Sequence, residues 1–325
     1  MLFMANLELI RKNLQNTLTE TNFSGLKKAY TGKVRDRYEK DGKLVFIATD
    51  RQSAFDRILA AVPFKGAVLN LFSKFWFEQT SDIVKNHMIA VPDPNVMVAQ
   101  KLKMYPVEVV VRGYITGSTS TSAWVNYEKG ERVFCGVELP EGLKKNQKFP
   151  RPIITPTTKS DEHDEKISRE EIIRRGLVPE EKWLQIEQAA LAVFERGQQK
   201  AAEKGFILVD TKYEFGEDEA GNIVLADEVH TPDSSRYWVA ETYEERFAAG
   251  LEPESMDKEF LRLWFKEHCD PYNDPELPPA PQDLIVKLSA KYIDIYEQIT
   301  GQTFEYHADK PIHERIQENL DAYFA

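Results

Sequence analysis

The sequence predicts an α+β protein in which antiparallel strand groups combine with segregated helices. Three observations support this class. Strand-type runs occur in pairs with turn signals between them, helical spacing dominates the C-terminal part, and a content of 42% hydrophobic and 29% charged residues is ordinary for a globular chain of 325 residues. The composition changes after Arg112-Gly113, so we expect one lobe over residues 1–112 and a second over residues 113–325.

The N-terminal part is predicted to form a helix, a β-hairpin and a second helix. Residues 7–18 have amphipathic helical spacing. The runs Ala29–Tyr38 and Leu44–Thr49 are separated by Asp41-Gly42, which is a strong signal for a tight hairpin turn. Residues 66–80 place large apolar side chains at helical spacing, and we interpret these side chains as core.

The middle of the chain contains one buried-type strand and a long irregular stretch. The strand is Val107–Arg112 and ends at Gly113. The chain is then rich in Ser, Thr and Pro up to about residue 158. Ser168-Arg169-Glu170-Glu171 has the capping-box pattern, so we expect a short helix that starts there and closes at Gly176.

The last part combines a second hairpin with several helices. A long helix is expected between Pro179 and Gly205, followed by a hairpin of residues 206–215 and 223–229. Further helices are expected over residues 257–268, 283–300 and 310–323.

The net charge of −11 restricts the function. It argues against a general nucleic-acid binder, which carries a basic surface, and it means that a site for anionic substrates has to be locally positive. No apolar run is long enough to span a membrane, and the N-terminus lacks the features of a signal peptide. Cys135 and Cys269 show neither metal nor disulfide spacing. We therefore expect a cytoplasmic protein without nucleic-acid or membrane partners.

The first candidate for chemistry is Gly32-Lys33-Val34-Arg35-Asp36, on the leading strand of the first hairpin. A glycine next to a lysine lets backbone amides and an ammonium group approach a phosphate closely. The Walker pattern is absent, and taken alone the Gly-Lys pair is also typical of a solvated strand.

The sharpest candidate lies in the second hairpin. On a strand, Asp210, Lys212 and Glu214 share one face. With a turn centred near Ala220-Gly221, Glu214 would lie directly opposite Asp227. Two facing carboxylates are destabilising unless a cation binds them, and Mg²⁺ prefers one or two carboxylates together with phosphate oxygens. The alternative is a solvent-facing hairpin that Lys212 neutralises.

A polar loop follows this hairpin, Thr231-Pro232-Asp233-Ser234-Ser235-Arg236. Its hydroxyls, amides and arginine suit a phosphate monoester, because a guanidinium group donates as a bidentate fork. Arg112 and Gly117-Ser118 form a similar set after the middle strand. Taken alone, the loop is also typical of a plain Pro-Asp turn, and an isolated arginine is usually structural.

Two other classes of site are disfavoured. Residues 157–165 combine acids with His163, but one histidine among flexible acids lacks metal-ligand spacing and is typical of a solvated loop. No Gly-x-Ser-x-Gly pattern occurs, which argues against a Ser-His-Asp hydrolase.

Taken together and in this order, the motifs resemble the SAICAR synthetase family of purine biosynthesis. The segments that carry the resemblance are GKVRDRYE (32–39), ATDRQSAFD (48–56), VEVVVRGYITGS (107–118), ITPTTKSDEHDE (154–165), LVDTKYEFG (208–216) and ADEVHTPDSSRYW (226–238). The wording SAFD and TPTTK is similar to the longer variety of the family, and the C-terminal helices carry fewer matches.

The resemblance implies a two-lobed, ATP-grasp-like fold with a kinase-like N-terminal lobe. It also implies roles for single residues: ATP binding by Gly32, Lys33 and Glu108, Mg²⁺ binding by Glu214 and Asp227, ribonucleotide binding by Arg112, Ser118, Asp233 and Arg236, and catalysis by Lys212 and Asp210. Segments 50–56 and 157–164 match without an implied role, the aspartate site being one possibility.

The implied activity is the ATP-dependent joining of L-aspartate to carboxyaminoimidazole ribonucleotide (CAIR), which gives SAICAR, ADP and phosphate. Two other functions are weighed against it. A kinase-like phosphotransferase would share the nucleotide lobe and would not need aspartate, and a non-catalytic module would bind ATP without turning it over. Facing carboxylates beside Lys212 argue against the module. We expect a monomer or a small homo-oligomer.

Overall fold

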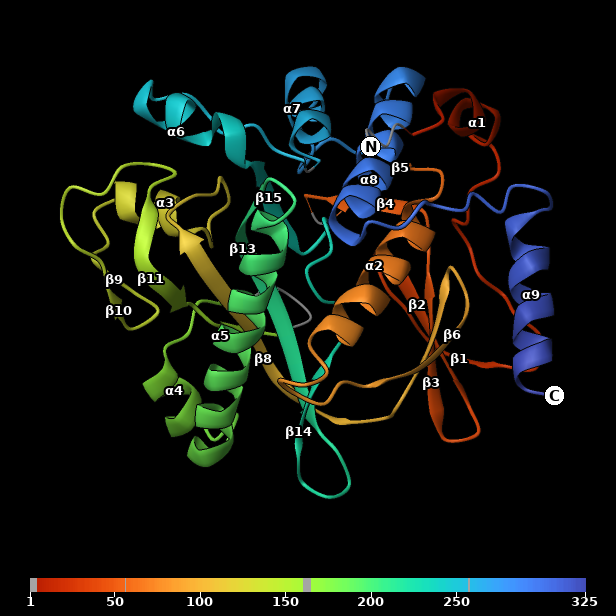
Figure 1. The fold of residues 1–325 in the computed structure, drawn as a ribbon, viewed down its shortest axis with the longest axis horizontal. Helices are drawn as coiled ribbons and strands as arrows, with labels where there is room; N and C mark the ends of the chain where they lie inside the picture. Colours follow the sequence, from red (N-terminus) through yellow and green to blue (C-terminus); the bar gives the residue numbers. More distant parts are fainter. Residues whose placement is uncertain (1–4, 56, 160–164, 257) are drawn as a thin grey trace. The chain divides into compact units, whose positions relative to one another are not determined.

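The computed structural model consists of two compact units (Figure 1). It describes residues 5–55, 57–159, 165–256 and 258–325. The first unit comprises Met1–Phe75, Met88–Lys101 and Met256–Ala325, and the second comprises Trp76–His87 and Leu102–Ser255. Both contain antiparallel sheets together with helices, so the predicted α+β class is confirmed. No helix among the described residues is both long and apolar enough to cross a membrane.

The first unit contains a five-stranded sheet with the strand order β1-β2-β3-β7-β6. Its strands are β1 (Lys27–Thr31), β2 (Arg35–Lys40), β3 (Lys43–Ala48), β6 (Met88–Asp93) and β7 (Val96–Ala99). Asp41 and Gly42 connect β2 to β3 with positive φ angles of 50° and 73°. Two consecutive positive φ values are what a two-residue hairpin turn needs, so this predicted turn is confirmed.

The predicted strand over residues 29–38 is wrong, because the chain turns back within it. Residues 32–34 form a turn, and β1 pairs with β2. The Gly32 amide donates to the carbonyl oxygen of Arg35 at 2.9 Å, and a Cβ on Gly32 would approach that oxygen to 2.5 Å. Only glycine fits this close approach. Strand-like residues on both sides of the glycine concealed the turn in the sequence.

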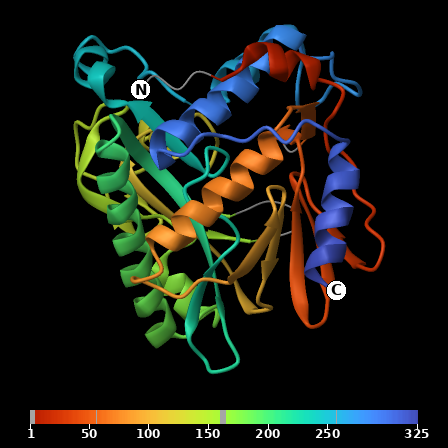
Figure 2. The same cartoon turned by 45° about the vertical axis from the view of Figure 1, so that its right-hand side comes forward.

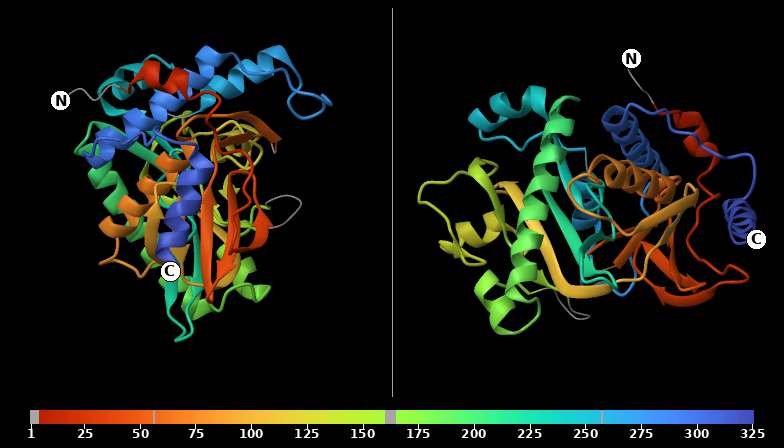
Figure 3. Two further views of the ribbon diagram at one scale, coloured as in Figure 1. Left: turned by 90° about the vertical axis from the view of Figure 1, so that its right-hand side faces the viewer. Right: turned by 60° about the horizontal axis from the view of Figure 1, so that its bottom comes forward.

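Helices complete the first unit. They are α1 (Leu7–Lys12), most of α2 (Lys65–Gln79), α7 (Glu259–His268), α8 (Gln282–Thr300) and α9 (Ile312–Tyr323), with a small hairpin of β4 (Arg51–Ala54) and β5 (Arg57–Ala61). The helix expected over residues 7–18 ends early, at Lys12. Figures 2 and 3 show α9 beside the five-stranded sheet, where Ile316 and Leu320 are buried against Val45 and Ile47.

The second unit is built on a six-stranded sheet with the order β11-β8-β13-β14, in which β12 also pairs with β8 and β15 with β13. These strands are β8 (Lys103–Tyr114), β11 (Lys148–Ile154), β12 (Thr157–Thr158), β13 (Phe206–Glu217), β14 (Ile223–Ala226) and β15 (Ser235–Val239). The long helix α5 (Glu180–Ala202) packs along β13 and β8 (Figure 3, right). Smaller elements are α3 (Ala123–Glu128), α4 (Arg169–Arg174), α6 (Ala240–Ala248), β9 (Val133–Phe134) and β10 (Val137–Glu138).

Most of the helices expected in the C-terminal half are confirmed. The Ser168 side chain caps α4 by accepting the Glu171 amide at 3.2 Å, as the capping-box pattern predicts. The strand β15 and the helix α6 have no counterpart among the expected elements. The boundary expected after Arg112 lies inside β8, so the compact units divide the chain differently from the predicted lobes.

Candidate active site

A row of charged side chains lies on one face of β13 in the second unit. Asp210, Lys212 and Glu214 alternate with Thr211 and Tyr213, as the strand period of two predicts. Asp210 is 4% exposed and Glu214 is 5% exposed. Buried carboxylates of this kind are uncommon unless they are paired, which excludes the alternative of a solvent-facing hairpin.

Asp210 lies between two arginines on the neighbouring strands. It is opposite Arg112 of β8 and Arg236 of β15. Its Oδ2 atom is 2.5 Å from Arg236 Nη1 and 3.6 Å from Arg112 Nη1. Arg112 also donates to Thr155 Oγ1 at 2.8 Å and to the carbonyl oxygen of Thr121 at 3.2 Å. These contacts hold two guanidinium groups near one another.

The electrostatics of this pair indicate a site for an anion. Burial lowers the pKa of Arg112, and the charge of Arg236 adds to this effect against the opposing attraction of Asp210. Two positive charges that are buried or half-buried repel one another. This repulsion is relieved when a dianion such as a phosphate binds.

Lys212 contacts two carboxylates further along the row. Its Nζ atom pairs with Glu108 Oε1 and lies 3.7 Å from Glu214 Oε1. Glu108 also accepts a hydrogen bond from Thr157 Oγ1 at 3.3 Å. Burial alone lowers the pKa of Lys212, but the charges of Glu108, Glu214 and Asp227 outweigh it and raise the pKa above its ordinary value. The ammonium group therefore stays charged at neutral pH.

The register of the second hairpin differs by one residue from the predicted one. Glu214 pairs with Ala226 of β14, so the prediction that it lies directly opposite Asp227 is wrong. Asp227 follows the strand with a φ of 66°, which takes the chain out of the ladder. The residue directly opposite Glu214 is Glu108 on β8. Burial and the charge of Asp227 nevertheless raise the pKa of Glu214, so these two carboxylates interact.

Lys159 completes the carboxylate cluster, and sequence reasoning gave it no role. Its Nζ atom is 2.5 Å from Glu214 Oε2. The preceding strand β12 pairs with β8 so that Thr157 lies opposite Glu108, and this pairing delivers Lys159 to the site. The Thr-Thr-Lys motif was the available signal, but a motif does not reveal which strand a loop returns to. Residues 160–164, which hold most of the acid–His cluster considered above, lie outside the described residues.

The Glu214–Asp227 pair suits a divalent cation whose remaining ligands come from outside the protein. No group of three or more His, Cys, Asp or Glu side chains within the described residues is arranged to hold a metal. Mg²⁺ typically takes one or two carboxylates from a protein and completes its shell with phosphate oxygens and water. Burial and then the charge of Asp227 raise the pKa of Glu214, and a bound cation would relieve the second of these effects.

The segment between β14 and β15 forms a compact polar turn. The amides of Ser234 and Ser235 donate to the carbonyl oxygen of Thr231 at 3.1 and 2.9 Å. The Thr231 hydroxyl donates to Glu228 Oε2 at 2.5 Å. Asp233 lies at the centre of this turn and is half-buried. The turn therefore holds a defined shape immediately before Arg236 begins to pair with β13.

A second segment, after β8, meets Arg236 from another direction. A Cβ built on Gly117 would lie 3.4 Å from Arg236 Nη2 and 2.4 Å from the Ser122 Cβ. The φ of 105° at Gly117 is also one that favours glycine. Ser118 follows this glycine and is exposed. The structure thus brings the segment of Gly117 and Ser118 next to Arg236.

A buried histidine supports the opposite face of β13. Tyr213 Oη and His230 Nε2 share a hydrogen bond of 2.5 Å, and the Trp76 ring meets the imidazole edge-on at a centroid distance of 4.6 Å. Tyr237 donates its hydroxyl to the carbonyl oxygen of His230 at 2.7 Å. Burial lowers the pKa of His230 to about 3, so the ring is neutral. These contacts tie β13 to the loop that carries Asp227.

In the first unit, Gly32 and Lys33 form the turn between β1 and β2. Arg51 donates to their carbonyl oxygens at 2.9 and 3.2 Å and pairs with buried Asp36 at 2.5 Å. Because a trans peptide places its N–H opposite its C=O, the amides of Lys33 and Val34 point away from Arg51. The Lys33 side chain is exposed. Sequence reasoning matched the segment that contains Arg51 but gave the arginine no role.

Comparisons with known proteins agree with these motifs. The model of the SAICAR synthetase family matches residues 28–278. A phosphoribosylaminoimidazole-succinocarboxamide synthase of Legionella pneumophila (strain Lens) is 58% identical over 304 residues, which cover 93% of this chain and 97% of that protein. The SAICAR synthase of Saccharomyces cerevisiae, solved in complex with SAICAR, is 39% identical with a TM-score of 0.76, covering 89% of this chain and 99% of that one. A type-2 SAICAR synthetase in complex with ADP is 32% identical with a TM-score of 0.64, covering 85% of this chain and 99% of that one.

Proposed function

The chain belongs to the SAICAR synthetase family and is therefore an ATP-dependent ligase of de novo purine biosynthesis. We propose that its ribonucleotide substrate binds along the charged face of β13, with its long axis parallel to the strand. The reaction joins L-aspartate to the carboxylate of CAIR and yields SAICAR, ADP and phosphate. One observation carries the proposal. The same face of β13 has a pair of arginines at one end and a lysine–carboxylate cluster at the other.

The arginine end would bind the 5′-phosphate of CAIR. Arg236 would donate to the phosphate as a fork, and Arg112 would add a second positive charge. Ser118 would contribute an exposed hydroxyl next to Arg236, and Asp233 would orient the turn before it. Asp210 holds both guanidinium groups in place through its contacts of 2.5 and 3.6 Å.

The carboxylate end would receive the reacting group of CAIR. Glu214 lies four positions after Asp210 on β13, which corresponds to roughly 13 Å along a strand. This spacing is comparable with the length of a ribonucleotide. Lys212 would hold the CAIR carboxylate and a phosphate oxygen of ATP together by neutralising both. Glu214 and Asp227 would bind Mg²⁺, which when bound supplies positive charge for the phosphoryl group.

In the first unit, Gly32 and Lys33 would bind ATP phosphates. Exposed Lys33 offers an ammonium group, and the amides of the turn point away from the Arg51 guanidinium that holds its carbonyl oxygens. Glu108 was assigned to ATP on the family resemblance. Its contact with Lys212 supports a role next to the phosphates through that lysine.

The chemistry follows from this arrangement. A carboxylate oxygen of CAIR attacks the γ-phosphorus of ATP, the bond to the β-phosphate oxygen breaks, and ADP leaves with an acyl phosphate remaining. The amine of L-aspartate then attacks the acyl carbon and displaces inorganic phosphate, forming the amide and losing one proton. Holding two anions in line supplies much of the rate, because effective molarities of aligned pairs are worth roughly 7–11 kcal/mol. Asp210 was also expected to accept the amine proton. With the 5′-phosphate bound at the arginine end, Asp210 lies about 13 Å along the strand from Glu214, so this arrangement assigns it to holding the two guanidinium groups instead.

A substitution at the phosphate end tests the proposal. We expect Arg236→Ala to raise the KM for CAIR roughly ten- to hundred-fold, because a charge-assisted hydrogen bond contributes about 1.5–3 kcal/mol. The KM for ATP should change little. Steady-state kinetics with each substrate varied in turn separate the two. Arg174→Ala is the matched control, since that side chain is 72% exposed on α4 and pairs with Glu171. An unchanged KM for CAIR in the Arg236 variant would remove the phosphate assignment.

The setting of the protein completes the proposal. Cys135 and Cys269 are both free thiols, as is usual in a reducing compartment, which supports a cytoplasmic enzyme. We propose a monomer or a small homo-oligomer, to be measured by size-exclusion chromatography with light scattering.

A further inference from the structure

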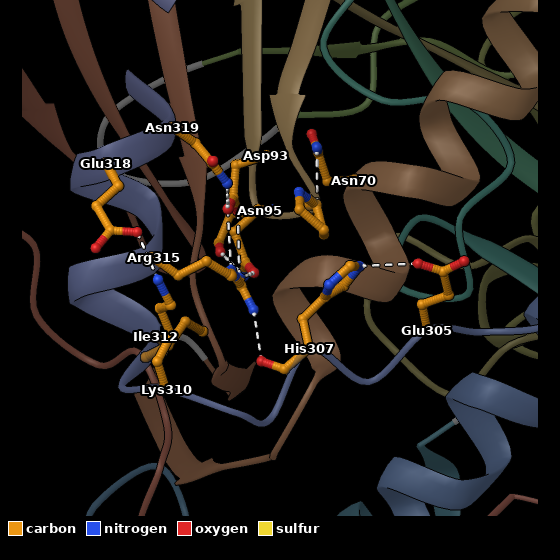
Figure 4. A network of polar contacts seen from close by, with 12 residues as sticks. Asn70, Asp93, Asn95, Glu305, His307, Lys310, Ile312, Arg315, Glu318 and Asn319 are labelled. Atoms are coloured by element: carbon orange, nitrogen blue, oxygen red, sulfur yellow. Dashed lines mark hydrogen bonds and ion pairs between the residues drawn. The ribbon is translucent and has the colours of Figure 1, made fainter. Parts of the chain in front are cut away.

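A buried charged fork joins the C-terminal helix α9 to the sheet of the first unit (Figure 4). Arg315 Nε lies 2.9 Å from Asp93 Oδ2, and Arg315 Nη2 lies 3.2 Å from Asp93 Oδ1. The Asp93 side chain is fully buried, and the Arg315 side chain is 11% exposed. Asn319, one turn further along the helix, donates to Asp93 Oδ2 at 2.7 Å. This is a bidentate pair with an additional donor, which is a geometrically demanding arrangement.

Apolar packing alone already attaches α9 to the sheet, without this ion pair. Ile316 and Leu320 on α9 are already packed into the apolar cluster of the sheet, with 0% and 2% exposure. Apolar packing stabilises the docked helix without the desolvation cost that a buried ion pair carries. A buried pair next to such packing therefore suggests a requirement for a defined position rather than for adhesion.

Asn95 links Arg315 to Ala48, the last residue of β3, by hydrogen bonds to both. Arg315 Nη2 donates to Asn95 Oδ1 at 2.6 Å, and Asn95 Nδ2 donates to the carbonyl oxygen of Ala48 at 2.9 Å. The Ala48 amide in turn donates to the backbone oxygen of Asn95 at 2.8 Å. An arginine has donors only, so it requires the oxygen of the Asn95 amide on its own side. The amide nitrogen is thereby directed at Ala48.

The residues after Ala48 hold the three carbonyl oxygens of the β1–β2 turn. Thr49 donates its amide and its hydroxyl to the oxygen of Val34 at 2.9 and 2.7 Å. Arg51 donates to the oxygens of Lys33 and Gly32 at 3.2 and 2.9 Å. The whole backbone of the turn is therefore shaped by the segment that begins at Ala48.

We propose that Arg315 is a positioning residue for the nucleotide-binding turn, acting through Asp93 and Asn95 on the segment that begins at Ala48. The C-terminal helix thus contributes to ATP binding through the shape of this turn. This inference rests on the proposed function, in which the Gly32–Val34 turn binds ATP phosphates. It assigns a role to the part of the chain where the sequence motifs are weakest.

The test compares two adjacent residues of α9 in the full-length enzyme. We expect Arg315→Ala to raise the KM for ATP roughly ten-fold, with the KM for CAIR within about two-fold of the original. Ile316→Ala removes packing from the same turn of the helix and keeps the fork. It should lower the melting temperature and leave the KM for ATP unchanged. Lys310→Ala breaks an exposed ion pair between Lys310, which precedes the helix, and Glu318 on it, and should change neither quantity.

Each outcome decides the question. An Arg315→Ala enzyme whose KM for ATP is unchanged overturns the proposal, and so does an equal rise in the Ile316→Ala enzyme, because helix docking alone would then explain it. If Arg315→Ala does not fold, Arg315→Lys carries the test. It keeps the charge near Asp93 but replaces the planar fork, which donates to Asp93 and Asn95 at once, by a single ammonium group, and the same rise is expected. Lys33→Ala tests the proposed function separately. A raised KM for ATP in that variant together with an unchanged value in the Arg315 variant overturns the positioning role alone.

Discussion

At the scale of single residues, the charged face of β13 holds side chains that destabilise the sheet. Glu214 lies opposite Glu108 in the sheet, although like charges in this position are destabilising. Lys212 and Lys159 neutralise the pair in part, yet the pKa of Glu214 remains raised by burial and by Asp227. A buried cluster of several carboxylates and lysines is typical of a functional site, because a purely structural sheet would replace it by apolar residues.

His230 provides a prediction about pH on the other face of the strand. The imidazole is neutral in the folded protein because burial lowers its pKa to about 3, against 6.5 in the unfolded chain. The unfolded state therefore binds more protons between these values, and stability falls as the pH drops through this window. The expected loss from this group between pH 7 and pH 5 is about 2 kcal/mol. Urea unfolding at the two pH values measures it.

The matched variant for this measurement is His230→Asn. Asparagine tolerates the φ of 52° at this position and does not titrate. The variant should be less stable overall because it leaves space beside Trp76, but its free energy of unfolding should decline less between pH 7 and pH 5. If the wild-type protein and the variant lose equal stability over this interval, the histidine is not the group responsible.

At the scale of elements, local signals were sufficient where the decisive contacts are local. The Asp41-Gly42 turn was predictable because it requires two positive φ angles, and Asp and Gly are residue types that adopt them. The alternation on β13 was predictable because the strand period does not depend on its neighbours. The register of the β13–β14 hairpin was not predictable, because Asp227 adopts a positive φ that its residue type permits without requiring.

Residues that act through distant contacts could not be assigned from the sequence. Lys159 reaches Glu214 across 55 positions of sequence, and Arg51 reaches the Gly32 carbonyl across 19. Both belong to segments that matched the family, so the sequence marked them as relevant. Their partners are set by the strand order of the sheets, which propensity and periodicity do not encode.

The helix α5 carries a prediction at this scale. A Cβ on Gly197 would lie 2.4 Å from His230 Cε1 and 2.6 Å from Leu208 Cδ2, so only glycine lets the helix approach β13 this closely. A Gly→Ala change inside a helix is normally stabilising by about 1 kcal/mol. Here we expect Gly197→Ala to destabilise by about 1–3 kcal/mol, because overpacking forces the helix off the sheet.

The control for this variant is Gln199→Ala, which makes its change at an exposed position of the same helix. It should be neutral or slightly stabilising in thermal and urea unfolding. Stabilisation by Gly197→Ala equal to that of an ordinary helical position would show that the close approach is relieved without cost.

At the scale of the whole molecule, the net charge and the local charge of the proposed site have opposite signs. The protein carries a net charge of −11, yet Lys33, Arg112, Lys212 and Arg236 place positive charge where anionic substrates are expected to bind. Local fields of this kind outweigh a diffuse opposite charge at short range. The expectation of a locally positive site, made from composition, stays a prediction, and the paired arginines beside Asp210 are the place where it would apply.

The path of the chain explains why its compact units were not predictable. The first unit is assembled from three separate stretches, and the second from two. The composition changes after Gly113 because β8 ends at Tyr114 and a polar loop begins. In sequence this loop resembles a linker between domains, but it directly follows a strand of the sheet. Because β8 pairs with β11, β12 and β13, a cut after residue 112 would remove most of a strand from the interior of the sheet.

Fragments of the chain test this division. We expect residues 102–255 to fold with a cooperative urea transition in tryptophan fluorescence, because they contain every strand of the six-stranded sheet. The fragment lacks Trp76, which packs on His230, so its stability should be lower than that of the same unit in the full chain. Residues 113–325 should aggregate, because the loss of β8 residues 103–112 exposes the unpaired edges of β11 and β13. Cooperative unfolding of the 113–325 fragment, combined with a disordered 102–255 fragment, would return the boundary to the position that the sequence suggested.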